Sequence, residues 1–167
     1  MGWIISESGA HNPRDDATMA SSYLPIDPEH RDDPFYRYQM ARLDCKVEGR
    51  GNGIKTALMN LAEVGRDIET PPDILMRHLK YELGAQGKLA SGRYVLTGRH
   101  SAEDLTEHLY SYISEVKLCS ECRSPETILG GKKRLKRKCR ACGAIEVVPT
   151  RLRVTDVLLK NAARAMK

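Results

Sequence analysis

The segment CSECRSPETILGGKKRLKRKCRACG, residues 119–143, carries the strongest structural signal in this sequence. Its cysteines form two C-x-x-C pairs, Cys119 with Cys122 and Cys139 with Cys142, separated by 16 residues. Each pair closes a tight loop that aims two sulfur atoms at one ion, and two pairs at this spacing can surround zinc. Four protein ligands leave no open coordination position, so the spacing predicts one structural Zn²⁺ in a zinc ribbon. A redox-active set of dithiols and an iron–sulfur cluster are the alternatives.

The charge is concentrated around these cysteines. The chain has 167 residues and a net charge of +5, but residues 117–167 alone carry +10 and residues 1–33 carry −5. Lys and Arg side chains bind phosphates with little sequence preference, so the basic run between the cysteine pairs predicts contact with RNA or DNA. A solvated ribbon face and a nuclear-localisation-like signal are the alternatives. The predicted nucleic-acid contacts are Lys132, Lys133, Arg134, Lys136, Arg137, Lys138 and Arg140.

The remaining cysteine, Cys45, brings the number of cysteines to five, which is odd. The N-terminus has no basic segment followed by an apolar one, so it shows no secretory signal. An odd count without such a signal favours a reducing compartment and a metal site over a disulfide framework. No apolar run approaches the roughly 18 residues of a membrane span.

Composition changes divide the chain into four parts. Residues 1–32 are polar, acidic and rich in turn formers, so we expect a disordered tail. Residues 33–116 have alternating and helical apolar patterns and form the predicted core domain. Residues 117–150 form the predicted ribbon, and residues 151–167 form a predicted C-terminal helical tail.

Two hairpins are predicted within the core. Residues 42–48 alternate, with Leu43, Cys45 and Val47 on one side, which indicates a half-buried strand. Asn-Gly within the following GRGNG, residues 49–53, is a strong hairpin signal. The sequence KLASGRYVLTG, residues 88–98, predicts the second hairpin.

Helical periodicity predicts helices over residues 60–68, 70–84 and 101–116. Thr70 is the expected N-cap of the second of these helices, and Gly84 is its expected C-terminal stop. Helices next to antiparallel hairpins predict an α+β fold, an antiparallel sheet packed with helices and followed by the ribbon.

The usual enzyme templates are missing from the sequence: it has no Walker loop, no G-x-S-x-G and no H-E-x-x-H. The glycines of residues 49–53 are too closely spaced for a dinucleotide-binding loop and are better explained by a hairpin. We therefore do not expect the chain itself to be an enzyme.

Several motifs together resemble a known family. DPFYRYQMARLDCKVEGRGNGIKT (residues 33–56), YELGAQ (81–86), RYVLTG (93–98) and the cysteine pairs resemble the N-terminal half of eukaryotic translation initiation factor five. The resemblance runs from about Asp33 to Asn161. The related beta subunit of initiation factor two shares the fold and the ribbon, but it is not expected to carry the F-Y-R-Y segment. The chain ends at Lys167 without the C-terminal HEAT-type domain that the resemblance leads us to expect.

The resemblance implies a GTPase activator rather than a hydrolase, with hydrolysis carried out by the gamma subunit of initiation factor two. It implies that Arg37 of F-Y-R-Y is a catalytic arginine finger. Lys55 of GIKT and Arg77 are the implied helpers, although Arg77 replaces the lysine that is usual in the family.

The resemblance also implies contacts with RNA and a set of partners. The implied partners are the gamma and beta subunits of initiation factor two, initiator tRNA, the small ribosomal subunit with its rRNA, and the mRNA start-codon region. The chain is expected to act as a monomer in the cytoplasm. A beta-subunit-like or mimic protein that binds the ribosome and initiator tRNA without activating hydrolysis is the alternative, and a general zinc-ribbon nucleic-acid binder is a third. The implied tRNA contacts are Lys46, Arg50, Gly51, Asn52, Gly53 and Arg93.

Overall fold

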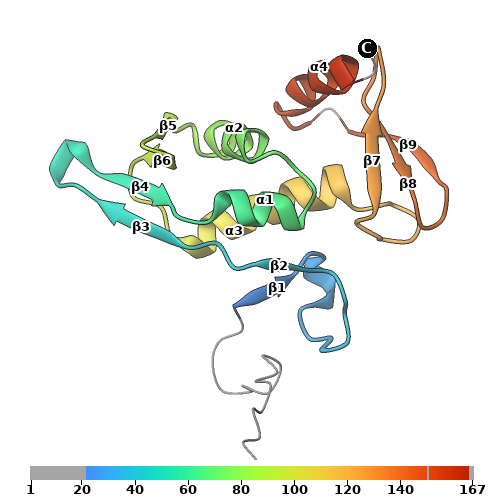
Figure 1. Cartoon of the computed structure of the whole chain (residues 1–167), viewed down its shortest axis with the longest axis horizontal. Helices are drawn as coiled ribbons and strands as arrows, with labels where there is room; N and C mark the ends of the chain where they lie inside the picture. The colour runs from blue at the N-terminus through green and yellow to red at the C-terminus, as the bar shows by residue number, and fades with distance from the viewer. Residues whose placement is uncertain (1–21, 150, 166–167) are drawn as a thin grey trace, which may run out of the picture.

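The computed structural model describes residues 22–149 and 151–165. Figure 1 shows an elongated arrangement, with the β3–β4 hairpin at one end and strands β7 to β9 with helix α4 at the other. The strands form three antiparallel sheets, with the orders β1-β2, β3-β4-β6-β5 and β7-β8-β9. Their bounds are β1 Tyr23–Pro25, β2 Gln39–Ala41, β3 Cys45–Glu48, β4 Lys55–Leu58, β5 Gly87–Ala90, β6 Arg93–Thr97, β7 Thr127–Gly130, β8 Lys136–Cys139 and β9 Ile145–Val147.

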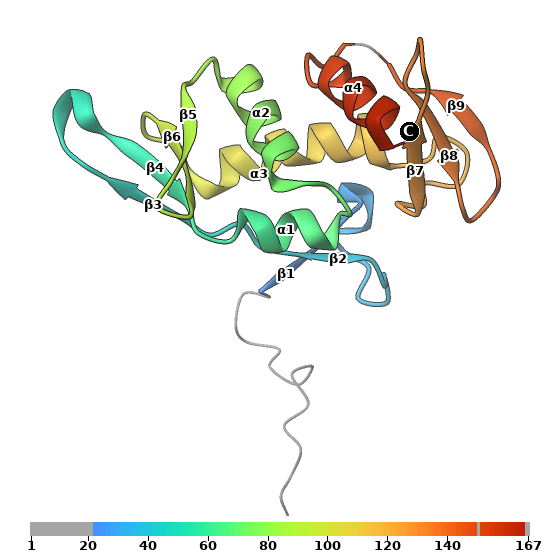
Figure 2. The same ribbon diagram turned by 45° about the horizontal axis from the view of Figure 1, so that its top comes forward.

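Helices cover the four-stranded sheet and connect it to the ribbon, and α3 runs lengthwise through the molecule in both views (Figures 1 and 2). The helices are α1 Leu61–Asp67, α2 Pro72–Leu83, α3 Ala102–Tyr112 and α4 Thr155–Ala165, with short 3-10 turns at Pro28–His30 and Gly51–Gly53 and a π-helical turn at Ile113–Lys117. This is the predicted α+β architecture, followed by the ribbon and a helix. Within the described residues, no helix is both long and apolar enough to cross a lipid bilayer.

Local signals set the helix ends. The Ser101 hydroxyl accepts a hydrogen bond from the Asp104 N–H at 3.1 Å and caps α3. Gly84 ends α2 in the left-handed conformation, with φ of 60°. The prediction that Thr70 caps α2 is wrong, because Pro71 occupies the cap position. The buried Thr70 hydroxyl instead donates to the Ile68 carbonyl at 3.2 Å.

One hydrophobic core continues from the α+β part into the ribbon. Its centre is formed by fully buried side chains of the helices and of β6, such as Leu75, Leu96 and Leu105. Leu118 and Val148 belong to the same buried cluster. The ribbon is therefore packed against the core.

The two predicted hairpins are present as β3–β4 and β5–β6. The first strand is shorter than predicted and is not half-buried, because Val47 is 38% exposed. Val47 is exposed because β3 is an edge strand, and Figure 1 shows the hairpin extending beyond the helices. Leu43 is buried as expected, but it lies just before the strand.

The prediction of a disordered tail over residues 1–32 is wrong for residues 22–32. Strand β1 pairs with β2, and Ile26 and Asp27 are buried. We call residues 22–41, which contain both strands, the N-terminal strap. Residues 1–21 lie outside the described part of the chain.

Candidate functional site

The F-Y-R-Y segment lies in the N-terminal strap between the 3-10 turn and β2. The Tyr36 ring stacks on His30, with centroids 4.3 Å apart, and burial raises the pKa of Tyr36 to about 12. The Tyr38 hydroxyl donates to Glu126 Oε1 at 2.7 Å, and the Tyr38 carbonyl accepts from the Ile26 N–H. The two tyrosines therefore anchor the segment from both sides of Arg37.

Arg37 itself is presented to solvent. Its side chain is 77% exposed, and its nearest charged partner is Glu126 Oε1 at 3.7 Å. The guanidinium carbon lies 4.9 Å from the centre of the Tyr38 ring. An exposed ion pair of this kind contributes only about 0–1 kcal/mol, so an external anion can take the guanidinium from Glu126.

A buried ion pair fastens the strap to the ribbon. The Asp27 carboxylate is fully buried and accepts hydrogen bonds from Arg123 at 2.7 and 2.8 Å. Burial alone would raise the pKa of Asp27, but the hydrogen bonds from Arg123 and from the Glu29 N–H outweigh it and lower that pKa. Arg123 directly follows Cys122, so the strap is tied to the first cysteine pair.

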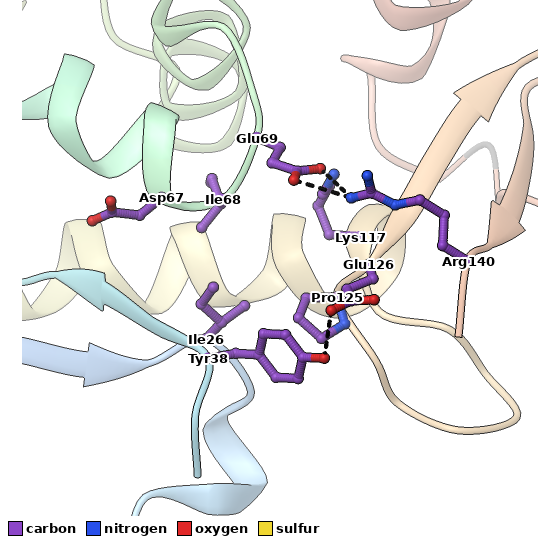
Figure 3. A pocket seen from close by; sticks show the side chains of 9 residues that line it. All are labelled: Ile26, Tyr38, Asp67, Ile68, Glu69, Lys117, Pro125, Glu126 and Arg140. Carbon is purple, nitrogen blue, oxygen red and sulfur yellow. Dashed lines mark hydrogen bonds and ion pairs between the residues drawn. The ribbon is translucent and has the colours of Figure 1, made fainter. Parts of the chain in front are cut away.

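A cavity of about 350 Å³ lies where strap, core and ribbon meet (Figure 3). Lys117 is 3% exposed there, and burial lowers the pKa of its amine. Arg140 forms hydrogen bonds of 2.8 and 3.0 Å with the Glu69 carboxylate beside it. The lining residues are Ile26, Tyr38, Asp67, Ile68, Glu69, Lys117, Pro125, Glu126 and Arg140.

The four ribbon cysteines are brought together as predicted and can hold a metal ion. Their sulfur atoms all lie within 4.8 Å of one another, and Cys119 with Cys142 and Cys122 with Cys139 are 3.6 Å apart. Four thiolates at about 2.3 Å from a tetrahedral zinc have sulfur atoms about 3.8 Å apart. The donor set and its spacing therefore fit Zn²⁺.

Arg137 supports this site from behind, and its predicted contact with nucleic acid is wrong. Alternate residues of β8 face opposite sides, and Arg137 is 4% exposed on the inner side. It donates to Glu146 Oε2 at 2.7 Å, and Glu146 Oε1 accepts from the Ser120 N–H. Burial opposes ionisation of Glu146, but these hydrogen bonds prevail and lower its pKa to about 2.

Most of the other predicted nucleic-acid contacts in the ribbon are available to a partner. Arg140 is the exception, because it is paired with Glu69. No ion pair within residues 22–149 and 151–165 involves the remaining five predicted contacts, and all of them are exposed. These are Lys132, Lys133, Arg134, Lys136 and Lys138.

The glycine-rich loop at the tip of the first hairpin is exposed throughout residues 49–53. Gly49 has φ of 90°, and a Cβ there would overlap the Gly53 carbonyl oxygen, so a side chain would disrupt the turn. Lys46 and Arg50 are exposed beside it, and Arg93 of the second hairpin pairs with Glu48 at 3.2 Å. The predicted tRNA contacts thus lie on the two neighbouring hairpins.

The predicted helpers of Arg37 are separate from it. Lys55 begins β4, opposite Glu48 at the base of the loop, and Arg77 lies on the exposed side of α2. Among the described residues, no hydrogen bond or ion pair joins Arg37, Lys55 and Arg77. Any joint action needs a partner surface that spans these elements.

The residues that hold the F-Y-R-Y segment in place were not predicted from the sequence. Asp27, Arg123 and Glu126 come from the supposed tail and from the turn after the first cysteine pair. The available signal was the short apolar run YLPI at residues 23–26, directly before Asp27.

Comparison with known proteins gives a consistent match. Residues 28–145 match the family described as the domain found in initiation factors 2B and 5. Eukaryotic translation initiation factor 5 of Caenorhabditis elegans is 39% identical over 132 residues, covering 77% of this chain and 30% of that protein.

The same factor of Saccharomyces cerevisiae is 38% identical over 133 residues, covering 77% of this chain and 33% of that protein. For Dictyostelium discoideum the identity is 36% over 136 residues, covering 81% of this chain and 35% of that protein. The chain thus spans about a third of the length of these curated relatives. Together with the α+β core and the four-cysteine ribbon, the match over residues 28–145 shows that the chain belongs to the family that shares the domain found in initiation factors 2B and 5.

Proposed function

We propose that this chain is a translation initiation factor that stimulates GTP hydrolysis by the gamma subunit of initiation factor two when the start codon is recognised. Hydrolysis takes place on the partner, so the chain is an activator and not an enzyme. It acts in the cytoplasm, in the preinitiation complex on the small ribosomal subunit, with the beta subunit and the mRNA start-codon region nearby. Relatives named translation initiation factor 5 support this role.

The observation that carries the proposal is the presentation of Arg37. Its guanidinium is 77% exposed while Tyr36 and Tyr38 on either side are anchored. A GTPase transition state spreads negative charge over phosphoryl oxygens, and an inserted arginine accelerates it by roughly 10³ to 10⁵. An arginine on an anchored segment loses less conformational freedom on insertion than one on a flexible chain.

Lys55 and Arg77 act as helpers from other elements. Both are exposed, and neither has an ion-pair partner among the residues that the structure describes. We assign them to contacts with the partner that orient Arg37, rather than to the reacting phosphate. Their substitution should therefore weaken binding or orientation more mildly than substitution of Arg37.

The hairpins contact initiator tRNA in this proposal. The glycine loop lets backbone approach nucleic acid closely, with Gly51 and Gly53 at its centre and Arg50 and Asn52 as donors. Lys46 and Arg93 extend this basic surface along the two hairpins.

The ribbon contributes one structural Zn²⁺ and a basic surface for rRNA. Zinc supplies folding energy here, because its four thiolate ligands close a module too small to build its own core. Lys132, Lys133, Arg134, Lys136 and Lys138 provide phosphate contacts. Arg140 joins them where its pair with Glu69 opens.

Single-turnover GTP hydrolysis tests the proposal. The complex of initiation factor two, GTP and initiator tRNA is mixed with small subunits and with the wild-type chain, Arg37→Ala or Arg37→Lys. Both variants should lose most of the stimulation, because lysine cannot copy the planar guanidinium fork, while binding to small subunits persists. Arg66→Ala, an exposed arginine of α1, is the matched control. If the wild-type chain binds but does not stimulate, the activator role is wrong and a binding-only role replaces it.

A further inference from the structure

A second groove lies between α2 and the β5–β6 hairpin, which are neighbours in both views (Figures 1 and 2). Its volume is about 370 Å³. It is separate from the F-Y-R-Y segment and from the glycine loop, because no residue of either lines it. The proposed activator role uses only Arg77 of this lining and assigns no function to the rest of the groove.

Unpaired cations line the groove. Arg77 and Lys80 lie one helical turn apart on α2, and Lys88 comes from β5, the edge strand of the sheet. Across the described residues, no ion pair involves any of the three. The only carboxylate of the lining, Asp73, accepts a hydrogen bond from the Tyr94 hydroxyl at 2.9 Å. The groove therefore keeps a positive charge that no described ion pair neutralises.

Aromatic rings accompany these cations. Tyr81 is 40% exposed and lies four residues after Arg77, so both side chains are on one side of the helix. Tyr94 is half-buried on the facing strand β6. The chain has only seven tyrosines and one phenylalanine, and two of these rings line this groove. Cations beside accessible rings are what binding sites for single-stranded nucleic acids combine.

We propose that this groove binds single-stranded RNA, with phosphates on Lys80 and Lys88 and a base against Tyr81. An acidic protein segment could neutralise the cations, but it would make no specific use of the ring faces. A nucleotide chain satisfies cations and rings together, since each phosphate is followed by a flat base. The site adds to the proposed hairpin and ribbon contacts and does not depend on the GTPase partner.

The electrostatic part of the proposal is tested with a fluorescent 12-nucleotide uridine RNA. Its affinity is measured by anisotropy from 50 to 300 mM KCl for the full chain and for Lys80→Gln/Lys88→Gln. Each phosphate contact on a single strand contributes about 0.7 to the salt slope, so the slope should fall by about 1.4. Arg77 stays intact because it has a proposed role toward the partner. Arg99→Gln/Lys160→Gln removes the same charge from exposed residues elsewhere and should leave the slope unchanged.

Stacking is tested at Tyr81. Tyr81→Ala should weaken binding by about fivefold or more, whereas Tyr81→Phe should retain it. A 4-thiouridine version of the RNA should cross-link within residues 72–94. An unchanged salt slope in Lys80→Gln/Lys88→Gln, or a cross-link confined to other segments, would overturn the proposal. Binding of a glutamate-rich peptide that requires both lysines, without such an effect on RNA, would also overturn it and make the groove a protein-docking site.

Discussion

The ion pair between Asp27 and Arg123 should respond asymmetrically to substitution. Arg123→Met leaves the Asp27 carboxylate, which is 0% exposed, without its cation. Removing one partner of a buried pair costs about 3–5 kcal/mol. Asp27→Asn instead removes the carboxylate partner of Arg123, whose side chain is 38% exposed and still forms an ion pair with Glu29 at 3.2 Å. Water and Glu29 can solvate it, so we expect only about 1–2 kcal/mol for Asp27→Asn.

Hydrogen exchange of the N-terminal strap measures this difference directly. The Ile26 N–H is bonded to the Tyr38 carbonyl at 2.9 Å and reports on strap opening beside Arg37. A loss of about 3 kcal/mol corresponds to roughly 100-fold faster exchange, if the strap opens as a local unit. Urea unfolding of both variants gives the effect on global stability.

Arg31→Met is the matched control for this comparison. It breaks an ion pair with Glu107 whose side chains are 50% and 66% exposed, and it should cost less than about 1 kcal/mol. Equal costs for Arg123→Met and Asp27→Asn would refute the claim that the carboxylate is the desolvated member. A cost of Arg123→Met no larger than that of Arg31→Met would refute the claim that the buried pair holds the strap.

Three further predictions concern the ribbon and the core. Cys139→Ser should abolish binding of the one zinc ion expected per chain, as measured by mass spectrometry, and should speed hydrogen exchange over residues 118–148. Cys45→Ser should leave the zinc in place. Burial lowers the pKa of His78, so the unfolded chain takes up its proton first as pH falls below about 6.5. Stability should therefore drop with a slope of up to about 1.4 kcal/mol per pH unit, and thermal unfolding of His78→Gln should lack this component. Arg137→Met should destabilise the ribbon in urea without changing the salt dependence of RNA binding, whereas Lys138→Met should do the reverse; the same outcome for both would contradict their opposite burial.

Features with short-range causes could be predicted from the sequence. The two C-x-x-C loops and the Ser101 cap each depend on a few neighbouring residues, and both are present in the structure. The hairpin that Asn-Gly signals is also present, although the positive φ angles of its loop fall on Gly49 and Gly51. Gly84 likewise ends α2 because the left-handed conformation favours glycine.

Features with long-range causes could not be predicted. The strap is held by Asp27 and Arg123, which are 96 positions apart, and nothing near Asp27 indicates that its charge will be neutralised. The burial of Arg137 and the exposure of Val47 depend on which face or edge of a sheet is covered. Alternation along a strand shows that two faces differ, but it does not show which face meets the core.

The most direct test of the arginine-finger role uses an analogue of the transition state. The gamma subunit of initiation factor two, in its complex on small subunits, is loaded with GDP and aluminium fluoride or with a non-hydrolysable GTP analogue, and binding of the chain is measured. A residue that acts in the transition state stabilises that state more than the ground state. Arg37→Ala should therefore lose most of its affinity for the aluminium fluoride complex and keep its affinity for the GTP-analogue complex. An equal loss for both complexes, or no loss for either, would contradict the proposal that Arg37 completes the partner's active site.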